Sequence, residues 1–161
     1  MSTPASSERI RQKLNLKRYL NELTSIIRRP VHADELGSLE QATSIREAGQ
    51  KFGVLASESC VVPFSARCSE RFKGFVQRLH DANPTSVYVW TPRTIVCGAL
   101  LVSSLDVVKF DFDFAVNEEG ILVFHSSDLK DRLLLDFADS ATGEKIMKIE
   151  TQGANWGKVA Y

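Results

Sequence analysis

The spacing of apolar side chains changes near residue 84. Before that point they recur every three or four residues, which predicts amphipathic helices at 9–28, 39–48 and 66–81. After it they alternate with polar residues and are rich in β-branched and aromatic types, which predicts strands. The expected strands are 87–90, 94–102, 107–116, 121–125, 132–137 and 145–151, with a further short strand at 58–62.

Capping and helix-breaking residues support the helical ranges. Pro30 ends the first helix, because the residue before a proline is pushed out of the α region. Ser38, with Gln41 three residues further on, fits a capping box for the second helix. Ser65 is placed to cap the third helix, and Asn83-Pro84 breaks it.

Short loops between the later strands indicate how the strands pair. The segments 117–120, 126–131 and 140–143 are rich in turn-forming residues. Successive strands joined by such short loops favour antiparallel pairing. Helices followed by strands indicate an α+β fold, in which N-terminal helices pack on one face of a C-terminal, mostly antiparallel sheet of five to seven strands.

The length of 161 residues matches that of one domain. We expect a flexible tail at 1–8, a mainly helical part at 9–82 and the antiparallel sheet at 86–161. No segment has the composition of a linker strong enough to divide the chain. We therefore interpret residues 1–161 as a single domain.

The predicted strand at 107–116 has the clearest two-faced pattern. Its three phenylalanines point one way and are expected in the core: Phe110, Phe112 and Phe114. Asp111 and Asp113 point the other way, and Asp136 takes an outward position in the strand at 132–137. If these strands are neighbours, the three carboxylates form one negative patch that a basic partner would neutralise.

Charge is balanced in total and uneven along the chain. Lys plus Arg and Asp plus Glu both number 20, so the formal net charge is zero, which argues against a globally basic nucleic-acid binder. Residues 1–29 carry a net charge of +5 and residues 104–150 a net charge of −6. These regions either attract each other within one domain, or one of them meets a partner.

The cysteines and the apolar segments indicate the cellular compartment of the protein. Cys60, Cys68 and Cys97 show no paired spacing, so we expect three free thiols and a reducing, cytoplasmic location. No run approaches the roughly 18 apolar residues of a membrane span, so stable membrane insertion is not expected. The N-terminal residues also lack the apolar segment of a signal peptide.

The residue patterns favour no catalytic chemistry. Asp111 and Asp113 share one polar face, without the difference in burial that would push their pKa values apart. Together with Asp136 and His125 they lack the spacing of a calcium or zinc motif. No GxSxG motif and no glycine-rich phosphate loop occurs, although a Cys–His pair formed by the fold stays open. We predict a non-enzyme without metal, cofactor or small-molecule substrate.

Trp156 lies between small residues near the C-terminus and has two interpretations. It anchors an interface, since aromatic residues dominate binding hot spots, or it closes the end of the core. Trp90, in the predicted strand at 87–90, has the same two interpretations.

Two stretches of the second half resemble a known class of proteins. Residues 120–137 (GILVFHSSDLKDRLLLDF) and 147–158 (MKIETQGANWGK) are similar to the strand pattern of small bacterial immunity proteins of contact-dependent inhibition and related polymorphic toxin systems. The resemblance implies a cytosolic, non-catalytic, single-domain protein that binds a cognate toxin domain and blocks it. It assigns no role to any individual residue.

These observations predict an immunity protein whose partner is a locally basic toxin domain. A toxin that acts on nucleic acid presents a basic cleft, and an acidic face steers association with it. The expected partner-binding residues are Asp111, Asp113, Asp136 and Trp156. Two alternatives stay open: a nucleic-acid or membrane-surface adaptor that uses the basic N-terminal helix, and a small cytosolic enzyme of undetected chemistry.

Overall fold

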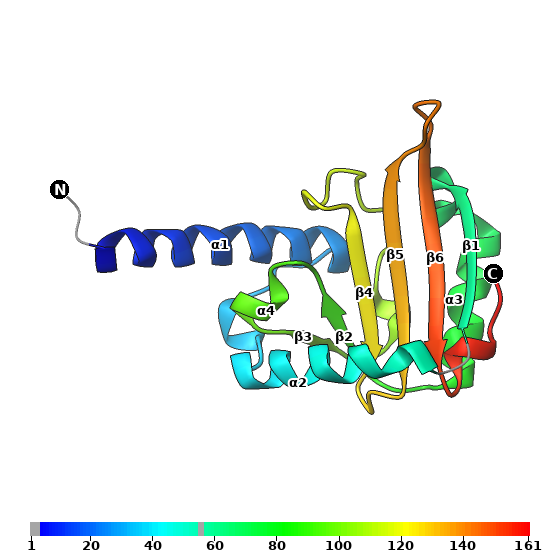
Figure 1. Ribbon diagram of the computed structural model, residues 1–161, viewed down its shortest axis with the longest axis horizontal. Helices are drawn as coiled ribbons and strands as arrows, with labels where there is room; N and C mark the ends of the chain where they lie inside the picture. The colour runs from blue at the N-terminus through cyan, green and yellow to red at the C-terminus, as the bar shows by residue number, and fades with distance from the viewer. Residues whose placement is uncertain (1–3, 55–56) are drawn as a thin grey trace.

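A six-stranded antiparallel sheet organises the part of the chain that the computed structural model describes, residues 4–54 and 57–161 (Figure 1). Its strands are β1 Ser57–Pro63, β2 Val87–Trp90, β3 Leu100–Val102, β4 Ile121–Ser126, β5 Asp131–Asp139 and β6 Lys145–Gly153. The α-helices are α1 Pro4–Ile27, α2 Leu39–Gln50, α3 Glu70–Ala82 and α4 Thr94–Cys97. Short 3₁₀ turns are η1 Ala33–Glu35, η2 Lys51–Val54, η3 Phe64–Cys68, η4 Leu105–Val107 and η5 Trp156–Lys158.

The strand order is β1-β6-β5-β4-β2-β3, and every neighbouring pair is antiparallel. β4, β5 and β6 form the predicted meander. β1 joins it from far away in sequence, with Ser57 opposite Gln152 and Pro63 opposite Ile146. The predicted α+β fold class is therefore confirmed, with a strand number inside the expected range.

Helix boundaries follow the caps closely, with two corrections. Ser38 caps α2 as predicted and accepts a hydrogen bond from the Gln41 amide. The cap of α3 is Ser69, not Ser65, because the chain first makes the turn η3. α1 already begins at Pro4, so the expected tail at 1–8 is wrong from residue 4 onward, and residues 1–3 lie outside the described range.

The segment predicted as a strand at 94–102 is instead a helical turn followed by a short strand. The Thr94 side chain accepts a hydrogen bond from the Thr91 amide and starts α4, which ends at Gly98. Gly98 has a φ of +99°, and a Cβ there would lie 2.3 Å from the Gly37 carbonyl oxygen. Only glycine fits this reversal, so the apolar run is divided, and Cys97 is half-buried in α4 rather than in a strand.

Residues 107–116 form no strand, and this is the main correction to the predicted sheet. We call residues 108–116 the strap. The alternation of faces is nevertheless right, since Phe112 is buried and Asp111 and Asp113 are exposed. The strap backbone bonds elsewhere: the Lys109 amide donates to the Ile26 carbonyl at 2.9 Å, and Arg67 donates to the Phe112 carbonyl at 2.8 Å. Turns at residues 110–111 and 114–115 interrupt the strap, yet exposure still alternates along it, because every second side chain packs toward the sheet.

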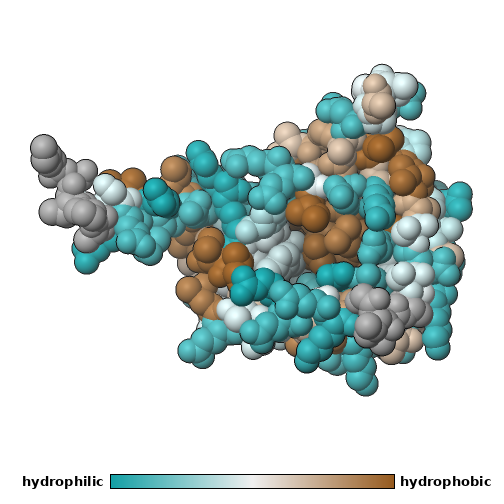
Figure 2. Space-filling view, in the orientation of Figure 1, coloured by the Kyte–Doolittle hydropathy of each residue, from teal (hydrophilic) through white to brown (hydrophobic). Residues whose placement is uncertain are grey.

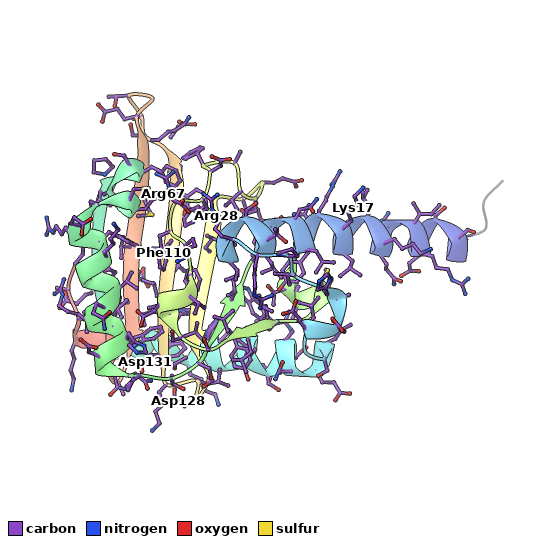
Figure 3. All side chains as sticks on the ribbon, turned by 180° about the vertical axis from the view of Figure 1, so that it is seen from behind. Lys17, Arg28, Arg67, Phe110, Asp128 and Asp131 are labelled. Carbon is purple, nitrogen blue, oxygen red and sulfur yellow. The ribbon has the colours of Figure 1, made fainter. Side chains whose placement is uncertain are left out.

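Aromatic rings on the strap fill the face of the sheet that lies in front in Figure 3, here called the back face. Phe112 packs against Phe64 and Phe137, with ring centroids 5.9 and 5.5 Å apart. Phe110 lies between α3 and the sheet and contacts Phe72 and Phe124 (Figure 3). The strap, η3, α3 and the C-terminal half of α1 thus share one core with the back of the sheet.

α2 lies on the opposite, front face (Figure 1), so the expectation that the N-terminal helices share one face of the sheet is wrong. It crosses the lower end of the sheet in Figure 1. Arg132 donates a hydrogen bond to the Gly49 carbonyl at 3.3 Å, and Phe52 stacks near His125 at 6.4 Å. Both His125 and Arg132 point away from the back face, since their neighbours Phe124 and Leu133 belong to the back-face core.

A buried carboxylate closes the lower end of the molecule. Asp131 is fully buried and accepts hydrogen bonds at 2.8 Å from the amides of Asn155 and Trp156 (Figure 3). Asn83 donates to its other oxygen at 2.7 Å. Gly153, with a φ of +116°, lets the chain turn here, because a Cβ would lie 2.1 Å from the Lys130 carbonyl oxygen.

Phe112→Ala should lower the free energy of unfolding by about 3–5 kcal/mol, because truncating a buried ring leaves a cavity among its neighbours. Chemical denaturation followed by circular dichroism measures this difference. Val61→Ala is the control, since Val61 is 61% exposed and should change stability by less than about 0.5 kcal/mol. A similar small effect of Phe112→Ala would contradict the strap as part of the core.

Candidate functional site

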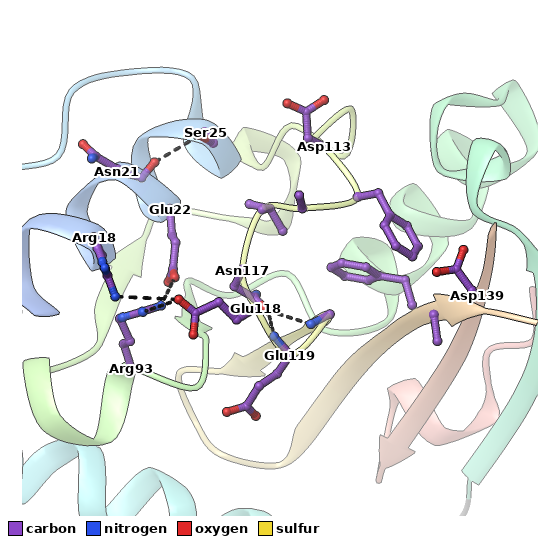
Figure 4. A pocket seen from close by; sticks show the side chains of 16 residues that line it. Arg18, Asn21, Glu22, Ser25, Arg93, Asp113, Asn117, Glu118, Glu119 and Asp139 are labelled. Atoms are coloured by element: carbon purple, nitrogen blue, oxygen red, sulfur yellow. Dashed lines mark hydrogen bonds and ion pairs between the residues drawn. The ribbon is translucent and has the colours of Figure 1, made fainter.

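A groove with several carboxylates in its lining runs between α1 and the segment that joins the strap to β4 (Figure 4). Its volume is about 890 Å³. Its acidic side chains are Glu22, Asp113, Glu118, Glu119 and Asp139. Its basic side chains are Arg18 and Arg93. We call this feature the acidic groove.

The tip of the segment 117–120 forms one wall, and its local sequence explains its shape. The Asn117 side chain accepts hydrogen bonds from the amides of Gly120 and Ile121 at 2.8 and 3.3 Å and donates to the Ile121 carbonyl at 2.8 Å. Gly120 has a φ of +66°, and a Cβ there would lie 2.3 Å from the Phe137 carbonyl oxygen. This closed turn holds Glu118 and Glu119 outward at the rim.

The inner wall holds a buried ion pair. Glu22 is only 6% exposed and pairs with Arg93, while Thr91 donates to its second oxygen at 3.1 Å. Burial raises the pKa of the Glu22 carboxyl, and the Arg93 guanidinium partly opposes that shift. Arg93 also reaches Glu118 at 3.2 Å. Removing either partner of such a pair leaves an uncompensated charge, so the pair supports the groove wall.

The remaining carboxylates of the groove make no ion pair within the described chain, although Lys145 lies opposite Asp139 in the β5–β6 register. Asp113, Glu119 and Asp139 are exposed, and no ion pair joins them to another described residue. Arg18 approaches Glu118 at 3.8 Å, and both side chains are more than half exposed. The groove therefore keeps a negative surplus next to a preformed guanidinium site, which is suited to the Arg or Lys side chains of a partner.

Asp111 does not add to this surplus. Arg28 donates to both of its oxygens, at 2.7 and 3.3 Å. Arg28 follows α1 with a φ of +61°, which turns the chain and directs its side chain toward the strap. Both partners are about half exposed, so the pair contributes little to stability, but it neutralises the charge of Asp111.

Asp136 lies on the other side of the sheet. It is exposed on the front face, opposite Lys148 in the β5–β6 register, while its neighbour Phe137 faces the strap on the back. The predicted single patch of three aspartates is therefore wrong: only Asp113 reaches the acidic groove. The prediction assumed that residues 107–116 pair within the sheet, whereas the strap lies across its back face.

The two tryptophans differ in burial. Trp156 is completely buried and held through its amide by Asp131, so its ring closes the core and is not presented to a partner in this fold. Trp90 is half-buried on β2, where its ring meets His125 at 5.9 Å.

Sequence reasoning missed most of the groove. Glu118 and Glu119 were assigned only to a turn, and Glu22 only to a helix of net positive charge. Two adjacent acidic residues at the tip of a turn were the available signal. No sequence signal brings Glu22 and Arg93 together, since they lie 71 residues apart.

The described residues contain no group of three or more His, Cys, Asp or Glu side chains close enough to hold a metal ion. All three cysteines are free, as predicted, although Cys68 is exposed rather than part of the helical core stripe. Burial raises the pKa of the Cys60 and Cys97 thiols, which disfavours the nucleophilic thiolate. No described helix is long and apolar enough to cross a membrane.

Comparison of the chain with protein-family models, curated proteins and solved structures gave no match.

A buried histidine sits on the front face, away from the groove. His125 is 3% exposed between Trp90 and Phe52. Burial, with a smaller contribution from the nearby Arg132, lowers the pKa of His125 from 6.5 to about 4. The folded protein therefore binds this proton less well than the unfolded chain, and the contribution to stability falls as pH drops from 6.5 toward 4.

His125→Gln should flatten the pH dependence of unfolding. The parent chain should lose roughly 2 kcal/mol through this group between about pH 7 and pH 5, and the variant should not. Urea denaturation at both pH values measures the difference. Equal losses in the two proteins would contradict a neutral, buried His125.

Proposed function

We propose that this chain is a non-catalytic immunity protein that binds a cognate toxin domain through the acidic groove. The observation that carries the proposal is the unneutralised set of carboxylates at Asp113, Glu119 and Asp139 around a groove of about 890 Å³. Exposed carboxylates cost the free chain little, and a cationic partner that covers them gains charge-assisted hydrogen bonds.

The inner wall supports a guanidinium or ammonium group as the bound chemistry. The groove already holds one guanidinium, that of Arg93, between Glu22 and Glu118. The exposed carboxylates around it offer further acceptor oxygens to a side chain supplied from outside. A partner loop that carries Arg or Lys would thus extend an ionic network that the fold has begun.

The charge distribution also favours rapid recognition. Exposed acidic residues at the groove rim attract a basic surface over about a Debye length. Toxins that act on nucleic acid need such a basic surface to bind phosphate. The resemblance of residues 120–137 and 147–158 to immunity proteins supports the same class of partner, and β4, β5 and β6 cover most of those residues.

One observation favours the adaptor as a second candidate. The first half of α1 projects from the body (Figure 1). Its basic side chains Arg9, Arg11 and Lys13 are exposed to solvent. A basic helix of this kind suits phosphate groups of a nucleic acid or a lipid surface. Affinity for duplex DNA that falls steeply with salt would favour this candidate over the immunity function.

Asp113→Asn combined with Glu119→Gln should weaken binding to the toxin domain encoded by the adjacent gene by at least about tenfold, which is 1.4 kcal/mol. Isothermal titration calorimetry of the full chain measures the affinity. Thermal unfolding should be nearly unchanged, because both side chains are exposed.

Asp136→Asn is the control: it removes one negative charge from the front face, as each of the two groove substitutions removes one from the groove. Its affinity should equal that of the parent chain. If the Asp136 variant loses affinity and the double groove variant does not, the front face is the interface and the groove is not. If the parent chain binds no neighbouring gene product, the immunity function is wrong.

A further inference from the structure

The first half of α1 projects from the body of the molecule (Figure 1), and its side chains lie in solvent. Residues 6–14 are all exposed, and Ile10 and Leu14 are 64% and 46% exposed. Figure 2 shows apolar surface on this projecting part among hydrophilic side chains, and Figure 3 shows α1 extending past Lys17 away from the body. Most helices in proteins gain stability by packing an apolar face, and this half of α1 leaves its apolar side chains Ile10 and Leu14 in solvent.

The rest of α1 is firmly rooted. Tyr19, Leu23 and Ile26 are fully buried. The Tyr19 hydroxyl donates to the Gly98 carbonyl at 2.7 Å and lies 3.0 Å from the Thr94 hydroxyl. The packing of the C-terminal half of α1 therefore fixes the direction in which the projecting half extends from the body.

The face of α1 that borders the acidic groove continues into the projecting half. Arg18 and Asn21 line the groove. Arg11 and Leu14 precede them by seven residues each, and seven residues make almost two full turns of an α-helix. One face of α1 thus carries Arg18 and Asn21 where the helix borders the acidic groove. The same face carries Arg11 and Leu14 in the projecting half.

We propose that two copies of this chain associate through antiparallel α1 helices, with the projecting half of each copy lying along the acidic groove of the other. With a twofold axis across α1, the contact between projecting half and groove forms twice, with the same surfaces each time. Arg11 of one copy then faces the carboxylates of Glu119 and Asp113 on the second copy, and Leu14 packs beside the groove wall.

The charge and the length of the projecting segment both match the acidic groove, which favours a second copy of this chain as the partner. Residues 6–17 carry four basic side chains against one acidic, whereas the groove carries five acidic against two basic, one of which is Arg18. The exposed segment 6–14 is about 13 Å long, and the groove-lining segment of α1, residues 18–25, is about 12 Å long. A phosphate surface would suit the basic residues but would be repelled by the adjacent groove, and it offers no cover for Ile10.

This association has a regulatory consequence, which rests on the proposed function. The second copy would occupy the groove that the toxin domain needs. Toxin binding would then require separation of the copies, so the free immunity protein would keep its cationic-ligand site covered. The association itself does not depend on any toxin.

Sedimentation velocity of the full chain, without any partner, tests the proposal. We expect a dimer of about 36 kDa at low ionic strength, twice the 18.0 kDa chain, and dissociation at high ionic strength. Arg11→Glu should weaken self-association at least about tenfold. Arg9→Glu is the matched control: it makes the same charge change nine residues before Arg18, hence on the opposite side of the helix, and should keep the dimer.

Exchanging the charges of Arg11 and Glu119 tests whether these two side chains meet across the dimer. Glu119→Arg alone should also weaken the dimer, and Arg11→Glu with Glu119→Arg in one chain should restore it. A monomer at low ionic strength, equal effects of Arg9→Glu and Arg11→Glu, or no restoration by the exchange would each overturn the proposal. A monomeric chain that co-sediments with duplex DNA would overturn it in favour of the adaptor.

These outcomes are separate from the proposed function. A dimer that behaves as expected but binds no toxin domain supports the association and contradicts the immunity function. A monomer that binds the toxin domain through the groove does the reverse.

Discussion

Burial of phenylalanine rings between the strap and the sheet is the constraint on which the rest of the structure depends. Phe64, Phe112 and Phe137 meet on the back face, with Phe114 at the edge of the same cluster. The strap contributes no strand hydrogen bonds, so ring packing and a few backbone contacts hold it. Its position in turn fixes where the turn at 117–120 emerges, and therefore where the acidic groove lies.

The groove combines two electrostatic situations with different physical costs. Glu22 and Arg93 are desolvated and compensate each other, which makes the pair part of the wall. The rim carboxylates keep their hydration, so their mutual repulsion costs little in the free chain. A surface of this kind loses little stability by staying unpaired and gains strongly from a cationic partner, which is why we connect it with binding rather than with catalysis.

α1 joins the two charge regions of a chain whose net charge is zero. At its root, opposite charges meet within one molecule, as Arg28 does with Asp111 and Arg18 with Glu118. The projecting half cannot reach the same groove, because a helix rises about 1.5 Å per residue in a single direction. Within one copy, the basic side chains of the projecting half therefore do not pair with the acidic groove. These unpaired charges underlie the proposed association between two copies.

The sequence by itself determined the elements whose signals are local: α2 with its Ser38 cap, the meander of β4, β5 and β6, and the inward side of each phenylalanine from 110 to 114. It determined these because periodicity and capping depend on neighbouring residues. Tertiary structure alone decided that 107–116 is a strap, that Asp136 and Asp113 lie on opposite faces, and that Glu22 meets Arg93. Side chains of the strap alternate between buried and exposed as they would in a strand, and the hydrogen-bond partners of the backbone, which depend on the whole fold, distinguish the two.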